Sequence, residues 1–210
     1  METIGSPATR TAVMYRRPPF DGYRFLFPVR SALIYILFLV TGLFLYRALA
    51  PVIGVFSCRT AERFCAAVTS RPTDVSAWLH GATDVLLDEW ILFGLAFLFT
   101  FSYFCDFLTS ALLAYRALLL GIAFGYMEAL LRRGACSAAF LTCFLIYEAC
   151  LSALFLLFAC RSAFLCARLR AEAPRAWLLS VRLAVSHALR TLFCMCIVYA
   201  LMTVCMYILS

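Results

Sequence analysis

The chain has 210 residues, of which 65% are hydrophobic, and its mean hydropathy is +0.96. Soluble globular domains average about 45–50% apolar residues, so a soluble globular fold is excluded. The net charge is +7, and all 18 basic residues are arginine. Because the arginines cluster in segments that flank apolar stretches, they indicate the orientation of a membrane protein and not nucleic-acid binding.

The chain opens with a polar, arginine-rich segment, residues 1–30, which we expect to be a mostly disordered cytoplasmic arm. The first predicted transmembrane helix covers residues 31–50. It ends in Ala48-Leu49-Ala50, a sequence similar to a signal-peptidase site. The long polar lead and the following Pro51 favour an anchor that is retained.

Residues 51–89 are predicted to form an external loop with two short amphipathic helices on the membrane surface. Helical spacing places one apolar set on one face, namely Ala61, Phe64, Cys65 and Val68. A second set follows the Thr73/Asp74 start signal and comprises Val75, Trp78, Leu79, Ala82 and Leu86. The loop also holds Cys58 and Cys65, which a helix would separate by about 10 Å along its axis. A disulfide needs Cα atoms within about 7 Å, so we do not expect a bridge.

A compact core of three transmembrane helices is predicted at residues 90–160, with spans at 90–108, 111–131 and 135–160. A basic cytoplasmic segment, residues 161–190, contains Pro174 and a helix expected to lie along the membrane. The last span covers about 191–209, within the terminal segment 191–210. The predicted fold class is an all-α polytopic membrane protein with about five transmembrane helices.

Arginine counting gives this protein an orientation with the N-terminus inside and the C-terminus outside. Eleven arginines lie in the predicted inner segments and five in the outer ones, which is the bias of the positive-inside rule. Arg132 and Arg133 fall in a short external turn and run against the bias. The parity of the spans depends on these two residues.

Three ionisable residues fall inside predicted spans, where charges are costly and often functional: Asp106, Arg116 and Glu148. At about 1.5 Å per residue, Arg116 and Glu148 reach nearly the same depth. We therefore predict that Arg116 lies between Asp106 and Glu148. The pairing can hold the bundle together or serve as a proton or ion pathway. Alternatively, Arg116 snorkels to the cytoplasm and Asp106 is hydrated.

Ala117, Gly121 and Gly125 repeat every four residues, a spacing that lets another helix approach closely. We expect them to pack against the span at 135–160, with homo-oligomerisation as the alternative. Cys136 and Cys143 belong to a second small-residue face on that span. Most of the eleven cysteines lie in apolar stretches, where cysteine behaves as a small hydrophobe.

Catalytic and metal-binding patterns are missing from the sequence. It contains no GxSxG, HExxH or Walker A motif. Cys194 and Cys196 form a CxC pair inside an apolar span without a nearby histidine. We therefore predict no enzymatic activity, no metal and no cofactor.

The run from Tyr115 to Gly125, YRALLLGIAFG, resembles the core hairpin of the stage II sporulation protein M family. In that family an aromatic or apolar residue precedes a basic residue, a small residue, apolar residues and glycine. The following Phe144–Ala149 and Ala153–Ala159 are similar to the family's next segment. The resemblance covers about residues 85–170. It departs from the family at Ile146-Tyr147, where the family usually carries a proline.

The resemblance implies a non-enzymatic membrane scaffold that localises a peptidoglycan-degrading complex at the bacterial septum during sporulation and engulfment. The implied partners are a lytic transglycosylase and an amidase/endopeptidase, met through the external loop, with Trp78, Leu79 and Leu86 as contact candidates. The protein would then lie in the septal or mother-cell membrane. The alternative is a small transporter, or a transporter subunit, that uses Asp106, Arg116 and Glu148 as a polar pathway.

Overall fold

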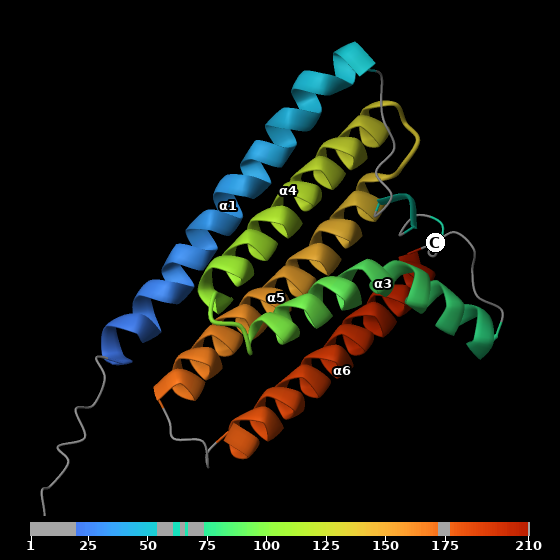
Figure 1. The fold of residues 1–210 in the computed structure, drawn as a ribbon. Coiled ribbons are helices and arrows are strands. Elements are labelled where there is room, and N and C mark those ends of the chain that lie inside the picture. Colours follow the sequence, from blue (N-terminus) through green and yellow to red (C-terminus); the bar gives the residue numbers. More distant parts are fainter. Residues whose placement is uncertain (1–19, 54–60, 64–65, 67–73, 172–176, 210) are drawn as a thin grey trace, which may run out of the picture.

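The computed structural model describes residues 20–53, 61–63, 66, 74–171 and 177–209, and these residues form helices joined by short turns. Its long helices, labelled in Figure 1, are α1 (Phe20–Ile53), α3 (Val75–Phe99), α4 (Cys105–Arg132), α5 (Ala138–Ala171) and α6 (Trp177–Leu209). The predictions for residues 1–19, for Cys58 and Cys65, and for most of the first amphipathic helix lie outside this part of the chain. The predicted all-α class is confirmed.

Four helices are long and apolar enough to cross a membrane, over Phe27–Pro51, Cys105–Arg132, Ala138–Ala167 and Val181–Cys205. Five spans were predicted, and the helix missing from the four is α3. Its second half is apolar, but Asp84, Asp88 and Glu89 lie in its middle. The structure therefore supports a multi-pass membrane protein with four apolar spans and one more polar long helix.

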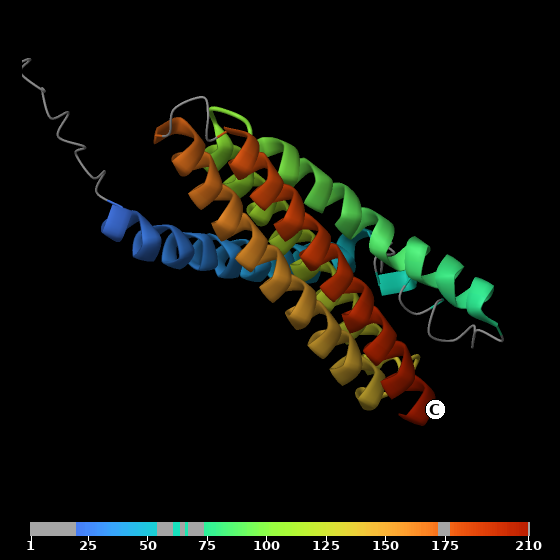
Figure 2. The same ribbon diagram turned by 90° about the horizontal axis from the view of Figure 1, so that it is seen from below.

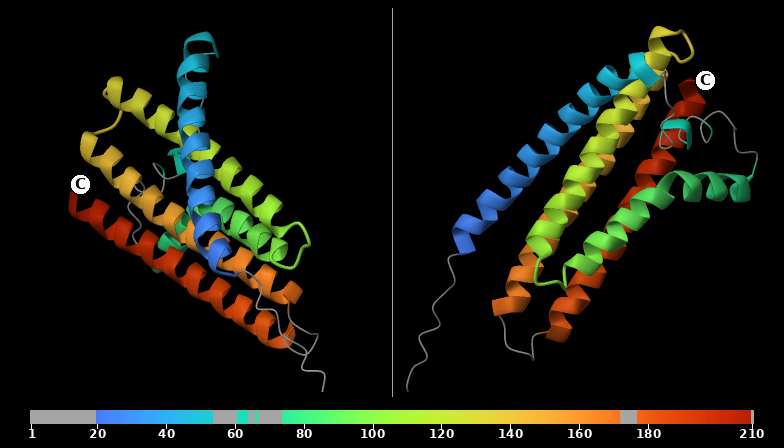
Figure 3. Two further views of the ribbon diagram at one scale, coloured as in Figure 1. Left: turned by 90° about the vertical axis from the view of Figure 1, so that its left-hand side faces the viewer. Right: turned by 45° about the horizontal axis from the view of Figure 1, so that its top comes forward.

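The helices α1 and α4 run in the same direction. The residue numbers of contacting pairs increase together along both helices, from Tyr35 with Arg116 through Gly42 with Gly121 to Arg47 with Glu128. The chain between them must therefore return to the end where it started, and α3 makes that return (Figure 1). Figure 2 and the left view of Figure 3 show α1 inclined to α4, α5 and α6, which lie nearly along one another.

The backbones of α1 and α4 approach each other very closely. A Cβ atom on Gly121 would overlap the Leu39 carbonyl oxygen and would stand 2.8 Å from the Leu43 nitrogen. A Cβ on Gly125 would meet the Tyr46 ring at 2.6 Å. Gly121 and Gly125 therefore pack against α1, and the prediction that these two glycines pack against the span at 135–160 is wrong. Gly42 on α1 lies opposite Gly121, and its missing side chain leaves room for α4. The spacing of small residues along α4 alone does not reveal this partner.

The turn between α3 and α4 lies at residues 100–104 and not at 109–110, as the predicted spans 90–108 and 111–131 require. Backbone hydrogen bonds from Thr100 to Phe97 and from Phe101 to Leu98, both 3.1 Å long, tighten the chain there. The Thr100 hydroxyl also donates to the Ala96 carbonyl. The turn is rich in aromatic residues, so hydropathy alone does not mark it.

Helix α3 joins two predicted elements, because the amphipathic helix after Asp74 continues into the apolar stretch after Trp90. The start signal is confirmed: the Asp74 carboxylate accepts a hydrogen bond of 2.8 Å from the Ala77 N–H, as an N-cap does. This bond and the Ser76 hydroxyl hold the pKa of Asp74 below its ordinary value. Figure 3 shows the first half of α3 projecting beyond α6.

The helices α5 and α6 extend well past the predicted limits of 135–160 and 191–209. With 34 and 33 residues, each is about 50 Å long at 1.5 Å per residue. A hydrocarbon core is about 30 Å thick. The basic stretch at 161–190 is therefore largely the ends of these two helices. Charge marks where a helix leaves the apolar layer and not where it ends.

Candidate functional site: a buried polar cluster

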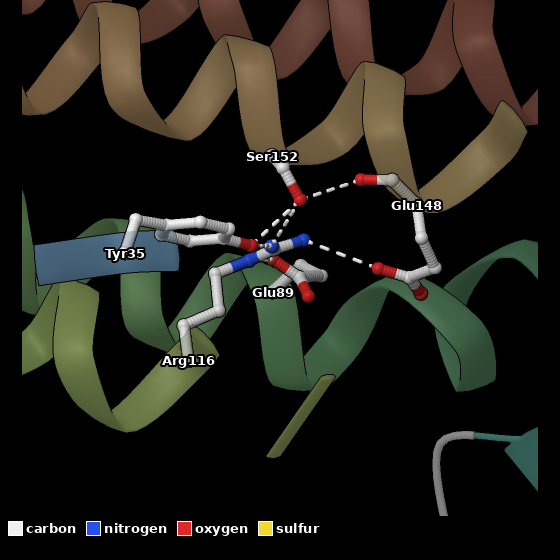
Figure 4. A network of polar contacts seen from close by, with 5 residues as sticks. All are labelled: Tyr35, Glu89, Arg116, Glu148 and Ser152. Carbon is white, nitrogen blue, oxygen red and sulfur yellow. Dashed lines mark hydrogen bonds and ion pairs between the residues drawn. The ribbon is translucent and has the colours of Figure 1, made fainter. Parts of the chain in front are cut away.

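Five polar side chains meet in the middle of the bundle, shown in Figure 4. They come from four helices: Tyr35 from α1, Glu89 from α3, Arg116 from α4, and Glu148 and Ser152 from α5. We call this group the polar cluster. It is the one place in the described residues where α1, α3, α4 and α5 share hydrogen bonds.

Arg116 forms the centre of the polar cluster and is only 2% exposed. Its Nε donates to Glu89 Oε2 at 2.8 Å, and its Nη2 donates to Glu148 Oε2 at 3.4 Å. Its Nη1 donates to the Tyr35 hydroxyl at 2.6 Å and to Ser152 Oγ at 2.8 Å. All three guanidinium nitrogens are therefore hydrogen-bonded, which is what a buried charge requires.

The two hydroxyls complete the polar cluster in a definite order. Ser152 donates its single hydroxyl proton to the Glu148 backbone carbonyl at 2.6 Å. The Tyr35 hydroxyl, 2.7 Å from Ser152 Oγ, therefore donates to Ser152 and accepts from Arg116. Each hydroxyl thus donates its proton to an oxygen and accepts a hydrogen bond from Arg116 Nη1.

Apolar side chains surround the polar cluster and keep its dielectric low. The Phe155 ring lies 5.6 Å from Arg116 Cζ, a separation at which a cation and an aromatic face attract. Phe155 also packs edge-on against Phe93, with ring centroids 5.8 Å apart. Leu113 and Leu151 are fully buried and belong to the same hydrophobic core as Phe93 and Phe155. Within the polar cluster, one guanidinium faces two carboxylates.

Of the three residues predicted to form an intramembrane cluster, the structure brings together Arg116 and Glu148 but does not add Asp106. Asp106 lies in the first turn of α4, ten residues from Arg116 on the same helix, which is about 15 Å along the axis. The prediction placed Asp106 on a neighbouring helix because it set the α3–α4 turn too late. Glu89 is the second acidic partner of Arg116.

Sequence reasoning missed Tyr35, Glu89 and Ser152. Glu89 was assigned to the end of an acidic external loop, one residue before the predicted span. Ser152 could have been found, because it lies four residues after Glu148 and so on the same helical face. Tyr35 carries no comparable signal in an apolar stretch that contains several aromatic residues.

The three predicted partner-contact residues have different surroundings on α3. Leu79 is 52% exposed. Trp78 is half-buried against Tyr199 of α6, with ring centroids 5.5 Å apart. Leu86 is fully buried in the core, so its side chain cannot contact a partner, and that prediction is wrong.

An apolar groove with a volume of about 380 Å³ lies between α3 and α6. Its lining residues are Trp90, Phe93, Gly94, Phe97, Ala188 and Leu192. None of them has a charged side chain, and none belongs to the polar cluster. Among the residues that the structure describes, no group of three His, Cys, Asp or Glu side chains could hold a metal ion.

Comparisons of this chain with protein-family models, with curated proteins and with solved structures find no match.

Proposed function

We propose that this chain is a non-enzymatic membrane scaffold, in which the closed polar cluster fixes four helices so that the bundle presents a rigid outer surface to other proteins. The observation that supports this proposal is the closure of the polar cluster itself. Arg116 and Glu148 are each only 2% exposed, and the Arg116 nitrogens are all engaged by protein groups. Such a network rigidifies a fold.

The transporter alternative would require these side chains to line an open polar cavity. The groove described above is apolar, lies between α3 and α6, and is lined by no residue of the polar cluster. The geometry therefore favours a structural role for Arg116 and Glu148. The transporter alternative can still be tested, because Arg116 faces two carboxylates, those of Glu89 and Glu148, and intramembrane carboxylates often bind protons.

The scaffold crosses the membrane five times in our proposal, with α3 as the additional crossing. Two parallel spans, α1 and α4, require a return crossing between them, and α3 runs antiparallel to α4 (Figure 1). The ion pair of 2.8 Å between Glu89 and Arg116 compensates the most deeply buried acidic charge of α3. We keep the inside location of the N-terminus, because the start of α1, the end of α5 and the start of α6, where most of their arginines occur in the sequence, lie at one end of the bundle (Figure 1).

Fusions of reporter enzymes test this topology directly. An alkaline phosphatase inserted after Phe104 of the full chain, with α4 to α6 retained, should be inactive, because the α3–α4 turn would be cytoplasmic, whereas the same insertion after Arg133 should be active. Green fluorescent protein should give the reverse pattern. Phosphatase activity after Phe104 would contradict the crossing of α3.

The docking surface in this proposal is the exposed face of the first half of α3, which projects beyond α6 (Figure 3). Val75 and Leu79 are 74% and 52% exposed there. Trp78 fixes this part of the helix against Tyr199. This part of α3 is thus held in place by Trp78 and presents the exposed apolar side chains of Val75 and Leu79, an arrangement common in protein interfaces.

The resemblance of Tyr115–Gly125 to the stage II sporulation protein M family suggests which proteins are held. On that basis the partners are peptidoglycan-degrading enzymes, a lytic transglycosylase and an amidase/endopeptidase, gathered at the septum during engulfment. The chain would lie in the septal or mother-cell membrane.

A photo-crosslinking amino acid at position 79 tests the proposal in cells. It should form adducts with a peptidoglycan hydrolase, whereas the same group at position 201, an exposed α6 site, should label only lipid. Deletion of the gene should stall engulfment at partly thinned septa. Normal engulfment would contradict the sporulation role, and identical labelling at both positions would contradict docking on α3.

Glu148→Gln separates the scaffold from the transporter. A scaffold should retain its adducts and its phenotype in this variant, because glutamine preserves the shape of the side chain. A transporter that moves protons through Glu148 should lose its activity. Loss of function with normal folding and normal crosslinking would overturn the scaffold proposal.

A further inference from the structure

Three nitrogen-rich side chains gather on one surface of the α5–α6 pair: Arg161 from α5, and His187 and Arg190 from α6. Arg161 Nη1 lies 3.2 Å from His187 Nδ1. Arg190 follows His187 by three residues, which places both on one helical face. Arg161 and Arg190 are exposed. We call these three residues the basic triad.

The hydrogen-bonding roles in the basic triad follow from the chemistry of arginine. A guanidinium only donates, so His187 Nδ1 is the acceptor and the proton of the neutral ring sits on Nε2. The imidazole therefore keeps one N–H donor, and both guanidiniums keep several. The basic triad is rich in donors.

Acidic partners for the basic triad are missing among the described residues. The ion pairs of this part of the chain involve Arg47, Arg63, Arg116 and Arg132, and none involves Arg161 or Arg190. The described part of α6 contains no Asp or Glu. Two guanidiniums that both lie near one imidazole, without a carboxylate among the described residues, favour an external anion.

The depth of the basic triad identifies the kind of anion. Arg161 lies 23 residues after the start of α5, about 35 Å along the helix, and Arg190 lies 19 residues before the end of α6, about 29 Å. A hydrocarbon core is about 30 Å thick, so both guanidiniums reach the headgroup layer when the opposite helix ends lie at the other surface. The anions at that level are lipid phosphates.

Exposed apolar side chains continue from the basic triad toward the middle of the membrane. Leu157 precedes Arg161 by four residues and is 59% exposed, and Phe193 follows Arg190 by three residues and is 67% exposed. They offer a surface for acyl chains directly beside the donors. Headgroup and tail of one lipid can therefore be bound together.

We propose that Arg161, His187 and Arg190 form a binding site for the phosphate headgroup of an anionic phospholipid, with its acyl chains against Leu157 and Phe193. This site does not depend on the scaffold function. The two guanidiniums supply the charge attraction, and the Nε2–H of His187 gives a directed hydrogen bond to a phosphate oxygen.

Native mass spectrometry of the full chain released from nanodiscs tests the site. Nanodiscs of equal phosphatidylglycerol and phosphatidylcholine content should yield protein carrying phosphatidylglycerol. The variant Arg161→Gln/Arg190→Gln should retain at least about tenfold less phosphatidylglycerol. Each basic residue near an anionic surface contributes about 1 kcal/mol, and a tenfold change corresponds to 1.4 kcal/mol. The matched control Arg132→Gln/Arg133→Gln removes two exposed charges at the opposite end and should retain the wild-type amount.

The outcomes distinguish the site from general charge effects. Equal loss in both double variants, or retention of phosphatidylcholine at the wild-type level of phosphatidylglycerol, would overturn the proposal. Competition by inorganic phosphate at millimolar concentration would assign the site to a free anion and also overturn it. Size-exclusion elution and circular dichroism of each variant confirm that the fold is intact, and His187→Phe provides a second variant with smaller expected loss.

Discussion

Replacing Arg116 by glutamine should destabilise the bundle far more than any exposed arginine replacement. The substitution removes the one positive charge that faces Glu89 and Glu148 and deletes most of the four side-chain hydrogen bonds of the guanidinium. Breaking a buried ion pair by removing one partner costs about 3–5 kcal/mol, because the remaining charge is left uncompensated. The free energy of unfolding should fall by that amount in mixed detergent–SDS micelles.

Arg132→Gln is the matched control for this measurement. Arg132 donates to Glu128 at 2.6 Å, but its side chain is 74% exposed, so the pair should contribute at most about 1 kcal/mol. Two further variants isolate the charge effect. Arg116→Glu combined with Glu148→Arg should recover part of the loss, whereas combination with Asp106→Arg should not. Equal losses for Arg116→Gln and Arg132→Gln, or rescue through position 106, would refute the closed cluster.

Three further predictions concern α3, α4 and the carboxylates. Gly121→Ala should destabilise the bundle by about 1–3 kcal/mol, because the added Cβ overlaps α1. Gly94→Ala is the control, because its Cβ meets nothing within 4 Å, and it should not destabilise the bundle. Equal stability of the two variants would contradict the close approach of α1 and α4. Glu89→Gln should destabilise more than Glu148→Gln, because the contacts with Arg116 are 2.8 and 3.4 Å long, and unfolding in mixed micelles measures both. The pKa of Asp74 is lowered in the folded protein, so its capping contribution is present above the unfolded pKa and is lost as the pH falls through the folded value; circular dichroism should show helix loss on acidification that Asp74→Asn, a neutral cap, abolishes.

Depth counting could bring Arg116 and Glu148 together because both lie well inside long apolar helices. A shift of a few residues in a boundary does not change their level. The same counting failed for Asp106, which lies close to the α3–α4 turn. There the identity of the helix depends on the position of a turn among Phe101, Tyr103 and Phe104, and hydropathy does not distinguish a turn from a helix in such a stretch.

The packing of α4 shows a second limit of single-chain reasoning. Ala117, Gly121 and Gly125 correctly predict a surface for close helix approach. The spacing describes one surface only and says nothing about which helix fills it. The answer requires Gly42 and Tyr46 on α1, whose positions opposite Gly121 and Gly125 come from the three-dimensional arrangement. Since α1 already occupies this surface, the stripe is not free to pair two copies of the chain.

The proposed crossing of α3 explains why its partner must be α4. An acidic residue at the centre of an isolated transmembrane helix costs about 2.5–3.5 kcal/mol, and α3 carries Glu89 as well as Asp84 and Asp88. Asp88 has its own partner, Arg63, at 2.8 Å, and Glu89 has Arg116. Because Arg116 is made after α3, Glu89 cannot be compensated until α4 is present. The two helices, joined by five residues at 100–104, are therefore expected to insert as one hairpin, and the charge pair that stabilises the folded bundle also decides how its most polar helix enters the membrane.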